Sequence, residues 1–192
     1  MLEKIIKIAC MRKGITNISQ IKMPLIIPSI DLYTGAVYIF TSVKNRNNYS
    51  DEYLYVNDAP IEKVVRASCS YPGVFSPCKY KNTELIDGGI RENVPWKITK
   101  QMGAGKVISI TFGDYIRKKN CPNIIDVVSN SIGIICHELS NYELCGADYI
   151  MKINTPEVSL LDVTEMETLY QCGYNSAKNK IKDIKQKILE IN

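Results

Sequence analysis

An aspartate followed by two glycines is the feature of this sequence best suited to chemistry. Asp87, Gly88 and Gly89 follow a short apolar run, and Pro95 favours the start of a helix a few residues later. Two glycines let the backbone turn sharply and approach a neighbouring group, because neither carries a Cβ. The carboxylate is then placed at a strand end, where α/β proteins hold their catalytic groups. The motif alone is also compatible with an ordinary Asp-Gly turn.

The flanking segments add to this motif. An A-S-x-S-x-P-G-x-F-x-P pattern occupies 67–77, a D-G-G-x-x-x-N-x-P pattern 87–95, and a G-A-x-K-V-I pattern 103–108. This order resembles the patatin-like phospholipases, which are lipid acyl hydrolases that use a Ser–Asp dyad. Weaker similarity lies at 24–35, 146–150 and 173–174. The resemblance covers nearly the whole chain and implies a single patatin-like domain over 1–192.

The resemblance also implies roles for individual residues. Asp87 is the base of the dyad, and Gly88 and Gly89 shape the backbone that aims it. Asn93 either hydrogen-bonds near the site or caps the helix that follows. A carboxylate with an ordinary pKa near about 3.9 is a weak base, so we expect partial desolvation to raise it. A direct Ser–Asp pair suits a chain whose only histidine is His137.

The family's nucleophile is not found in this sequence. Patatin-like enzymes carry it on a G-x-S-x-G turn that follows a glycine-rich oxyanion loop, and neither pattern occurs here. We therefore expect the first strands, the oxyanion loop and the nucleophile to be missing, so that the isolated chain hydrolyses no ester. Ser68 and Ser70 lie near the motif but in no glycine elbow, and structural roles are expected for both. Tyr71, Pro72 and Phe75 line either an acyl pocket or the core.

Apolar periodicity places these residues on alternating helices and strands. Helices are predicted over 1–13, 60–69, 95–103, 122–144 and 165–191, and strands over 25–30, 36–43, 85–86, 107–112 and 149–153. Asn57 or Asp58 is expected to cap the second helix, Asp31 to be a hairpin residue, and 71–82 to be irregular. This alternation favours an α/β fold with a mainly parallel sheet, and the resemblance implies three layers, α/β/α.

Composition limits the function further. The 192 residues are 45% hydrophobic and 23% charged, with a net charge of +4, which is ordinary for a globular domain. No arginine-rich run suggests nucleic acid. Seven cysteines without a C-x-x-C pair support neither a zinc site nor a disulfide framework, and we expect no metal or cofactor. Without a signal segment or a spanning apolar run, a cytoplasmic chain is expected.

Contact with a membrane stays an alternative. The last helix carries Ile181, Ile184 and Ile188 on one face and lysines on another. This pattern is typical of a packed helix with a solvated face, and also of a helix that lies on a membrane surface.

Three functions remain open from the sequence. In the first, the chain belongs to a lipid acyl hydrolase and supplies Asp87 to a serine located elsewhere, with a lipid or ester as substrate. In the second, it is a non-catalytic remnant that binds lipid or a partner protein. An esterase with an unrecognised nucleophile is a third reading.

Overall fold

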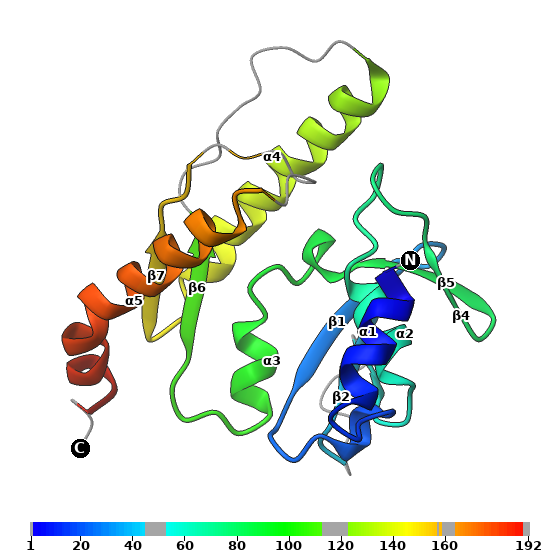
Figure 1. Ribbon diagram of the computed structural model, residues 1–192, viewed down its shortest axis with the longest axis horizontal. Coiled ribbons are helices and arrows are strands. Elements are labelled where there is room, and N and C mark those ends of the chain that lie inside the picture. The colour runs from blue at the N-terminus through cyan, green and yellow to red at the C-terminus, as the bar shows by residue number, and fades with distance from the viewer. Residues whose placement is uncertain (1, 45–52, 113–122, 157, 159–163, 190–192) are drawn as a thin grey trace. The chain divides into compact units, whose positions relative to one another are not determined.

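The computed structural model describes residues 2–44, 53–112, 123–156, 158 and 164–189 (Figure 1). The chain forms two compact units. The N-terminal unit comprises 1–93 with 121–136, and the C-terminal unit comprises 94–120 with 137–192. Helix α4 (Ile124–Leu144) contributes its first part to one unit and its last part to the other. The assignment of 1–192 to a single domain stays a prediction.

The N-terminal unit is built on a five-stranded sheet with the order β3-β2-β1-β5-β4. The strands are β1 (Ile26–Asp31), β2 (Val37–Thr41), β3 (Tyr53–Val56), β4 (Cys78–Tyr80) and β5 (Thr83–Asp87). Strand β1 pairs antiparallel with β2 and with β5, and β5 pairs antiparallel with β4. Only β3 runs parallel to its neighbour β2 among the described strands of this sheet.

Two helices pack against this sheet. Helix α2 (Ile61–Ser68) contacts β1, β4 and β5, and α1 (Leu2–Met11) packs on α2 (Figure 1). The core between them is apolar, and its largest buried members include Ile18, Phe40, Val64 and Leu85. Ile18 comes from the short 3-10 helix η1 (Ile18–Gln20), whose Asn17 cap also accepts the Ser19 N–H.

The C-terminal unit holds a two-stranded parallel sheet of β6 (Ile108–Phe112) and β7 (Tyr149–Ile153). Helix α5 (Met166–Leu189) packs on β7 and buries Met151 and Ile153 against Ile184. Helix α3 (Trp96–Gln101) precedes β6. Asp148 joins these elements, because its carboxylate meets Lys100 Nζ at 2.7 Å and accepts the Val107 N–H at 2.8 Å. These contacts hold the pKa of Asp148 well below its usual range.

The α/β class, with helices packed on a sheet, is confirmed, whereas the third layer stays a prediction. The prediction of a mainly parallel sheet is wrong for the five-stranded sheet, because three of its four strand pairs are antiparallel. Tight turns join β1 to β2 and β4 to β5, and a turn of a few residues can link only antiparallel strands. The expected cap of α2 is also wrong. Pro60 occupies that position, and Asp58 Oδ1 instead accepts the Asn17 side-chain N–H at 2.8 Å.

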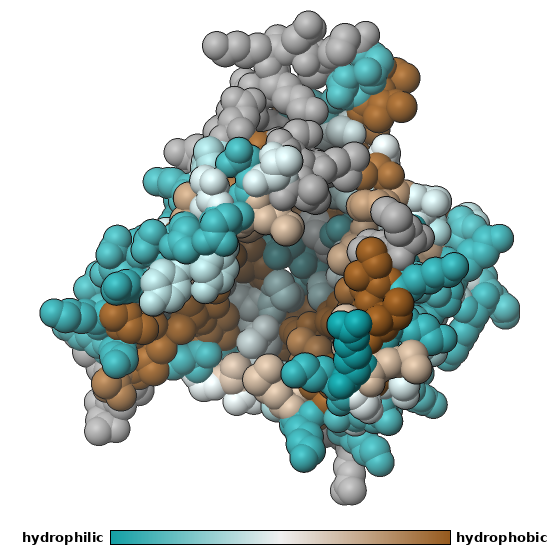
Figure 2. All heavy atoms as spheres, viewed as in Figure 1, coloured by the Kyte–Doolittle hydropathy of each residue, from teal (hydrophilic) through white to brown (hydrophobic). Residues whose placement is uncertain are grey.

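Apolar side chains are exposed at several places among the described residues, including the start of α4 and one face of β6. At the start of α4, Ile124 and Ile125 are exposed, and Figure 2 shows brown apolar spheres at this helix tip. Along β6, three apolar side chains on one face are exposed: Ile108, Ile110 and Phe112. None of the helices in the described part of the chain is both long enough and apolar enough to cross a bilayer.

Candidate functional site

Asp87 ends strand β5 and begins the 3-10 turn η2 (Gly88–Ile90). Its Oδ1 accepts the Gly89 N–H at 2.8 Å, and its own N–H donates to the Ser70 carbonyl at 3.2 Å. The second carboxylate oxygen, Oδ2, receives no described hydrogen bond among the residues that the structure covers. The Asp87 side chain is therefore held in place by a hydrogen bond to Oδ1, whereas no described group holds Oδ2.

The two glycines serve different purposes. A Cβ on Gly88 would lie 2.4 Å from the Pro28 carbonyl oxygen of β1, so only glycine fits this close approach of two backbones. A Cβ on Gly89 would lie 2.8 Å from Asn93 Oδ1 and 3.1 Å from Asp87 Oδ1. The missing side chain of Gly89 thus leaves the space in which the Asn93 carboxamide and the Asp87 carboxylate come together.

Asn93 does not cap the next helix. Pro95 holds the cap position of α3, with no side-chain hydrogen bond. The prediction that Asn93 is an N-cap is therefore wrong, because η2 turns the chain back and brings Asn93 over Gly89. The turn is anchored further by Arg91, whose guanidinium donates to the Gly35 carbonyl of the β1–β2 hairpin at 2.6 Å.

The serines upstream of the turn support the backbone. Ser70 is fully buried, and its hydroxyl accepts from the Arg66 guanidinium and donates to the Arg66 carbonyl at 2.9 Å. Arg66 also donates to the Ser76 carbonyl at 2.8 Å, and its guanidinium lies over the Phe75 ring. The structural role expected for Ser70 is confirmed. Ser68 is half-buried at the end of α2.

Burial shapes the electrostatics of the site. Desolvation raises the pKa of the Asp87 carboxyl above its ordinary value, and the Gly89 N–H lowers it by less. This is the direction expected from the sequence. Burial also raises the pKa of the Cys69 thiol, and the negative charge of Asp87 raises it further against the opposing effect of Arg66. Cys69 therefore stays a neutral thiol at neutral pH and is a poor nucleophile.

Arg66 and Cys69 belong to the surroundings of Asp87 although the sequence did not single them out. The sequence indicates them only indirectly, because both lie on or beside the segment whose Ser70 carbonyl accepts the Asp87 N–H. Tyr71 extends this segment, and its hydroxyl donates to the Ser129 carbonyl of α4 at 3.4 Å. Phe75 is partly exposed beside Arg66 and is not a core residue.

Asp31 is a hairpin residue, as expected. Its carboxylate accepts the backbone N–H groups of Tyr33 and Thr34 at 2.8 and 3.1 Å and the Thr83 hydroxyl at 2.7 Å. Burial by itself would raise the pKa of Asp31, but these hydrogen bonds outweigh it and hold the pKa below its ordinary value. The fold thus stabilises the charged form of Asp31, whereas it disfavours the charged form of Asp87.

Within the described residues, no group of three or more histidine, cysteine, aspartate or glutamate side chains is arranged to hold a metal ion. On the last helix, Ile184 packs against β7, whereas Ile181 and Ile188 are partly exposed. The contact of Ile184 with β7 therefore supports the prediction that this helix packs against the fold through its apolar face.

Comparison with known proteins places this chain in a family. The family described as Patatin-like phospholipase matches residues 2–100, a range that includes the whole Asp87 turn and Asn93. An "Uncharacterized protein R571" of Acanthamoeba polyphaga mimivirus is 28% identical over 196 aligned positions. That alignment covers 94% of this chain but 61% of the viral protein, so the chain spans less than two thirds of its relative. The chain belongs to the patatin-like phospholipase family.

Proposed function

We propose that this chain provides the carboxylate of a Ser–Asp dyad in a lipid acyl hydrolase, and that Asp87 is the base. The observation that carries the proposal is the state of Asp87: a half-buried carboxylate with a raised pKa, held through Oδ1 by a glycine turn. The pKa of Asp31, a structural carboxylate in the same unit, is shifted in the opposite direction. Perturbed groups of this kind concentrate at functional sites.

The Asp87 oxygen that receives no described hydrogen bond, Oδ2, defines the chemistry of the proposal. Oδ2 would take the proton from a serine hydroxyl as the serine oxygen attacks the ester carbonyl carbon. The protonated carboxyl would then give that proton to the departing alcohol oxygen as the acyl–enzyme forms. Water would release the acid in a second step, with Asp87 again the proton acceptor. A pKa raised toward the working pH makes the carboxylate a stronger base in both steps.

The supporting residues keep this carboxylate in place. Gly88 lets η2 lie against β1, and Gly89 donates to Oδ1 while leaving room for Asn93. We infer that the Asn93 carboxamide orients the carboxylate or a polar group of the substrate, because its Oδ1 and Asp87 Oδ1 face the same glycine. Each is a positioning residue in this proposal.

The serine itself is proposed to come from polypeptide outside these 192 residues. No G-x-S-x-G occurs in the sequence, and the Ser70 hydroxyl is engaged on both sides by Arg66. The viral relative is longer than the part of it that aligns with this chain. The absence of a nucleophile turn equally favours the second candidate, a non-catalytic protein that binds lipid or a partner protein.

The first measurement is translation of the DNA upstream of Met1 in all three frames, followed by expression of any longer reading frame that encodes G-x-S-x-G. Hydrolysis of a chromogenic ester and of phospholipid vesicles is then compared for the wild type and Asp87→Asn. We expect kcat to fall by about 10²–10⁴-fold, the usual contribution of a general base. We also expect wild-type kcat/KM to fall as the pH drops through the raised pKa of Asp87.

Two controls decide between the candidates. The isolated 192-residue chain is expected to release no chromophore, and release abolished by Asp87→Asn would show that it carries its own nucleophile. Asp31→Asn serves as a carboxylate replaced outside the site, with kcat unchanged in whatever protein remains folded. Equal activity of the wild type and Asp87→Asn would reject Asp87 as the base. An upstream region without a serine turn would favour the binding protein.

A further inference from the structure

A pocket lies between α1 and the start of α2, at the opposite end of α2 from Asp87. Its volume is about 380 Å³, which is within the range of small-molecule sites. Pro60 and Glu62 line it from the start of α2, whereas the end of α2 leads to Ser70 and Asp87. Eight helical residues span about 12 Å, so the pocket is separate from the candidate active site.

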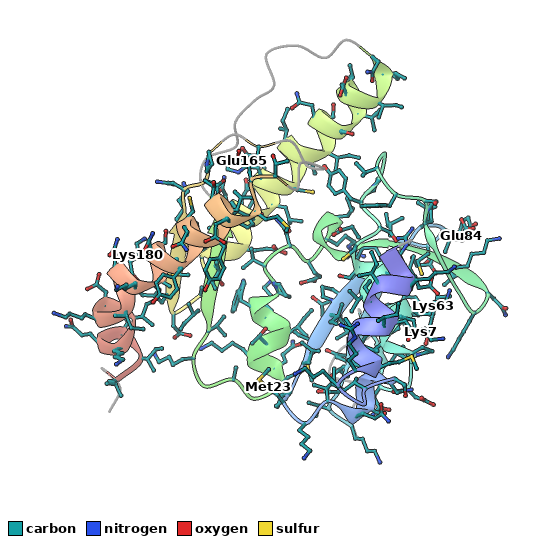
Figure 3. All side chains as sticks on the ribbon, in the orientation of Figure 1. Lys7, Met23, Lys63, Glu84, Glu165 and Lys180 are labelled. Atoms are coloured by element: carbon teal, nitrogen blue, oxygen red, sulfur yellow. The ribbon has the colours of Figure 1, made fainter. Side chains whose placement is uncertain are left out.

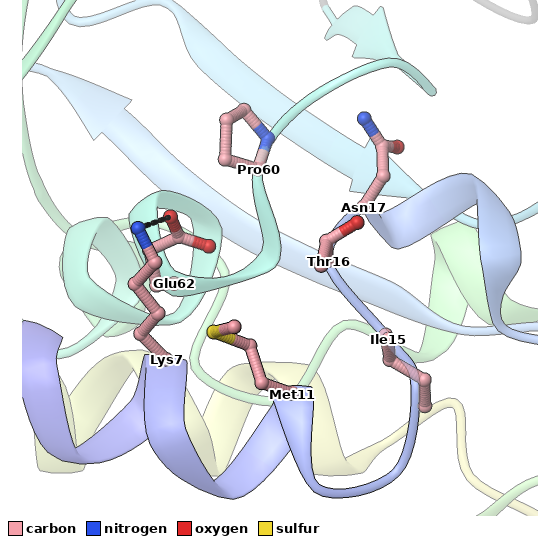
Figure 4. A pocket seen from close by; sticks show the side chains of 7 residues that line it. All are labelled: Lys7, Met11, Ile15, Thr16, Asn17, Pro60 and Glu62. Atoms are coloured by element: carbon pink, nitrogen blue, oxygen red, sulfur yellow. Dashed lines mark ion pairs between the residues drawn. The ribbon is translucent and has the colours of Figure 1, made fainter.

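Opposite charges face each other across one end of this pocket. Lys7 of α1 and Glu62 of α2 form an ion pair with Nζ 3.9 Å from Oε1 (Figure 4). That distance is too long for a direct hydrogen bond. The Glu62 side chain is only 16% exposed, whereas the Lys7 side chain is 57% exposed. Neither group makes another described hydrogen bond or ion pair, so the half-buried Glu62 carboxylate has one weak described partner.

The neighbouring ion pair shows the contrast. Lys63 of α2, labelled with Lys7 in Figure 3, meets Glu3 of α1 at 3.1 Å. Both of its side chains are 38% exposed, so Glu3 is more exposed than Glu62, whereas Lys63 is less exposed than Lys7. Helices α1 and α2 are therefore joined by one ion pair at hydrogen-bonding distance, Lys63–Glu3, and by one longer ion pair, Lys7–Glu62, which lines the pocket.

The remaining walls limit what can bind there. Met11, Ile15 and Pro60 are apolar and would contact a short carbon chain (Figure 4). Thr16 adds a hydroxyl whose present bond to Gln20 Oε1 is long, at 3.3 Å, and can be exchanged for an anionic oxygen. None of the described residues that line the pocket is aromatic, although quaternary ammonium groups are bound mainly by aromatic cages.

We propose that this pocket binds a small zwitterion in which a primary ammonium and a phosphate lie two carbons apart, the chemistry of phosphoethanolamine and of an ethanolamine lipid headgroup. The ammonium donates to the sheltered Glu62 carboxylate. The phosphate is held by Lys7 at the mouth and by the Thr16 hydroxyl. The weak Lys7–Glu62 pair is thus replaced by two charge-assisted contacts, which are stronger than neutral hydrogen bonds.

The test is a titration of the 192-residue chain, followed by NMR shifts or calorimetry, with phosphoethanolamine as the probe. A Kd of about 1 mM is expected for so small a ligand. Phosphocholine has no N–H donor and ethyl phosphate has no amine, so both should bind about tenfold or more weakly. Binding of all three with equal affinity would overturn the proposal, because it would show no recognition of the ammonium.

Variants locate the contacts. Glu62→Gln keeps the side-chain shape and should weaken phosphoethanolamine binding about tenfold while leaving ethyl phosphate unchanged. Lys7→Gln should weaken both. Lys4→Gln removes an exposed lysine of the same helix that does not line the pocket, and it should bind as the wild type does. Wild-type affinity in Glu62→Gln, with a wild-type circular dichroism spectrum, would reject the site.

Vesicles separate the two sources of this chemistry. Flotation with phosphatidylethanolamine vesicles, but not with phosphatidylcholine vesicles, and its loss in Glu62→Gln would assign the pocket to a lipid headgroup. Binding of free phosphoethanolamine without flotation would assign it to a soluble ligand. Failure of both probes overturns the proposal. Asp87→Asn should bind as the wild type, so this result is independent of the proposed hydrolase function.

Discussion

At the scale of single residues, the surroundings of two aspartates in the N-terminal unit shift their pKa values in opposite directions. Asp31 receives three described hydrogen bonds, whereas Asp87 receives one and is desolvated. The fold favours the charged form of the first and the neutral form of the second. Such a conflict between stability and charge is characteristic of groups retained for chemistry.

Replacement of Asp87 by asparagine should therefore leave the fold as stable or make it more stable at neutral pH. Asparagine can still accept the Gly89 N–H but carries no charge to desolvate. A raised folded pKa means that the native state binds the proton more tightly. The contribution of Asp87 to the free energy of unfolding is thus greatest below its ordinary pKa of 3.8. It is lost as the pH rises through the pKa that Asp87 has in the folded state.

Thermal melts from pH 3 to pH 8 test this. Relative to the wild type, Asp87→Asn should gain about 1–4 °C in Tm between the acid and neutral ends of the range. A variant that loses stability most strongly at neutral pH would mean that the Asp87 charge is compensated in the folded state.

For Asp31 the sign is reversed. The pKa is lowered, so its contribution is present at neutral pH and is lost as the pH falls from the ordinary value of 3.8 through the folded pKa. Asp31→Asn cannot accept all three hydrogen bonds and should cost about 1–2 kcal/mol at pH 7. Urea unfolding at pH 7 and pH 3 measures this, and a cost that is unchanged at pH 3 would contradict the assignment.

At the scale of elements, the junction of β1 with η2 depends on Gly88. Gly88→Ala would push a Cβ against the Pro28 carbonyl and should destabilise the chain by about 2–3 kcal/mol. In Gly89→Ala the added atom meets the Asn93 side chain, which can rotate away. That variant should fold normally and lose activity in a protein that has the serine.

Gly105→Ala is the control for both, because nothing lies within 4 Å of an added Cβ there. Its stability should match that of the wild type in urea unfolding. If Gly88→Ala were as stable as Gly105→Ala, the close backbone approach would not be a constraint.

Strand β6 predicts a second property of the isolated chain. Its one neighbour among the described strands is β7, and Ile110 and Phe112 are 58% and 71% exposed. A bare strand edge with an apolar face favours association. We expect self-association at about 10–100 μM, reduced by Ile110→Lys and unaffected by Thr111→Lys on the other face. Sedimentation velocity measures this, and a wild-type monomer throughout would contradict it.

Elements with a strong local pattern were predictable from the sequence, and pairing was not. The amphipathic helix at the N-terminus and the run that became β7 were found near their observed positions. Strands β3 and β4 were missed, because they are short and their stability comes from neighbours rather than from alternation. The direction of pairing depends on which strands meet, which a local pattern does not contain.

At the scale of the whole molecule, each of the two units has its own core. The C-terminal unit buries fewer described apolar side chains than the N-terminal unit, and they are Val94, Ile98, Val107, Met151, Ile153 and Ile184. We expect it to open first, so that calorimetry gives a van't Hoff enthalpy below the calorimetric one. Hydrogen exchange should protect β1 and β2 more than β6 and β7. A single two-state transition would instead support one domain over 1–192.

The candidate site was predictable to the extent that it is local in sequence. Asp87 and its glycines form one continuous motif, so their types and spacing identified them. Arg66 and Cys69 were not found, because they reach the site through the fold of another segment. The pocket at Lys7 and Glu62 could not be predicted for the same reason, since no local pattern relates residues so far apart in the chain.

The contact between Gly88 and Pro28 also bears on how this chain can evolve. The atom that an added Cβ would meet first is a backbone oxygen, which every residue type at position 28 would carry. No exchange at position 28 can therefore compensate for a larger residue at position 88. The two positions should vary independently among homologous sequences, with glycine fixed at 88 in lineages under selection for Asp87. Loss of that glycine would mark lineages in which the selection has ended.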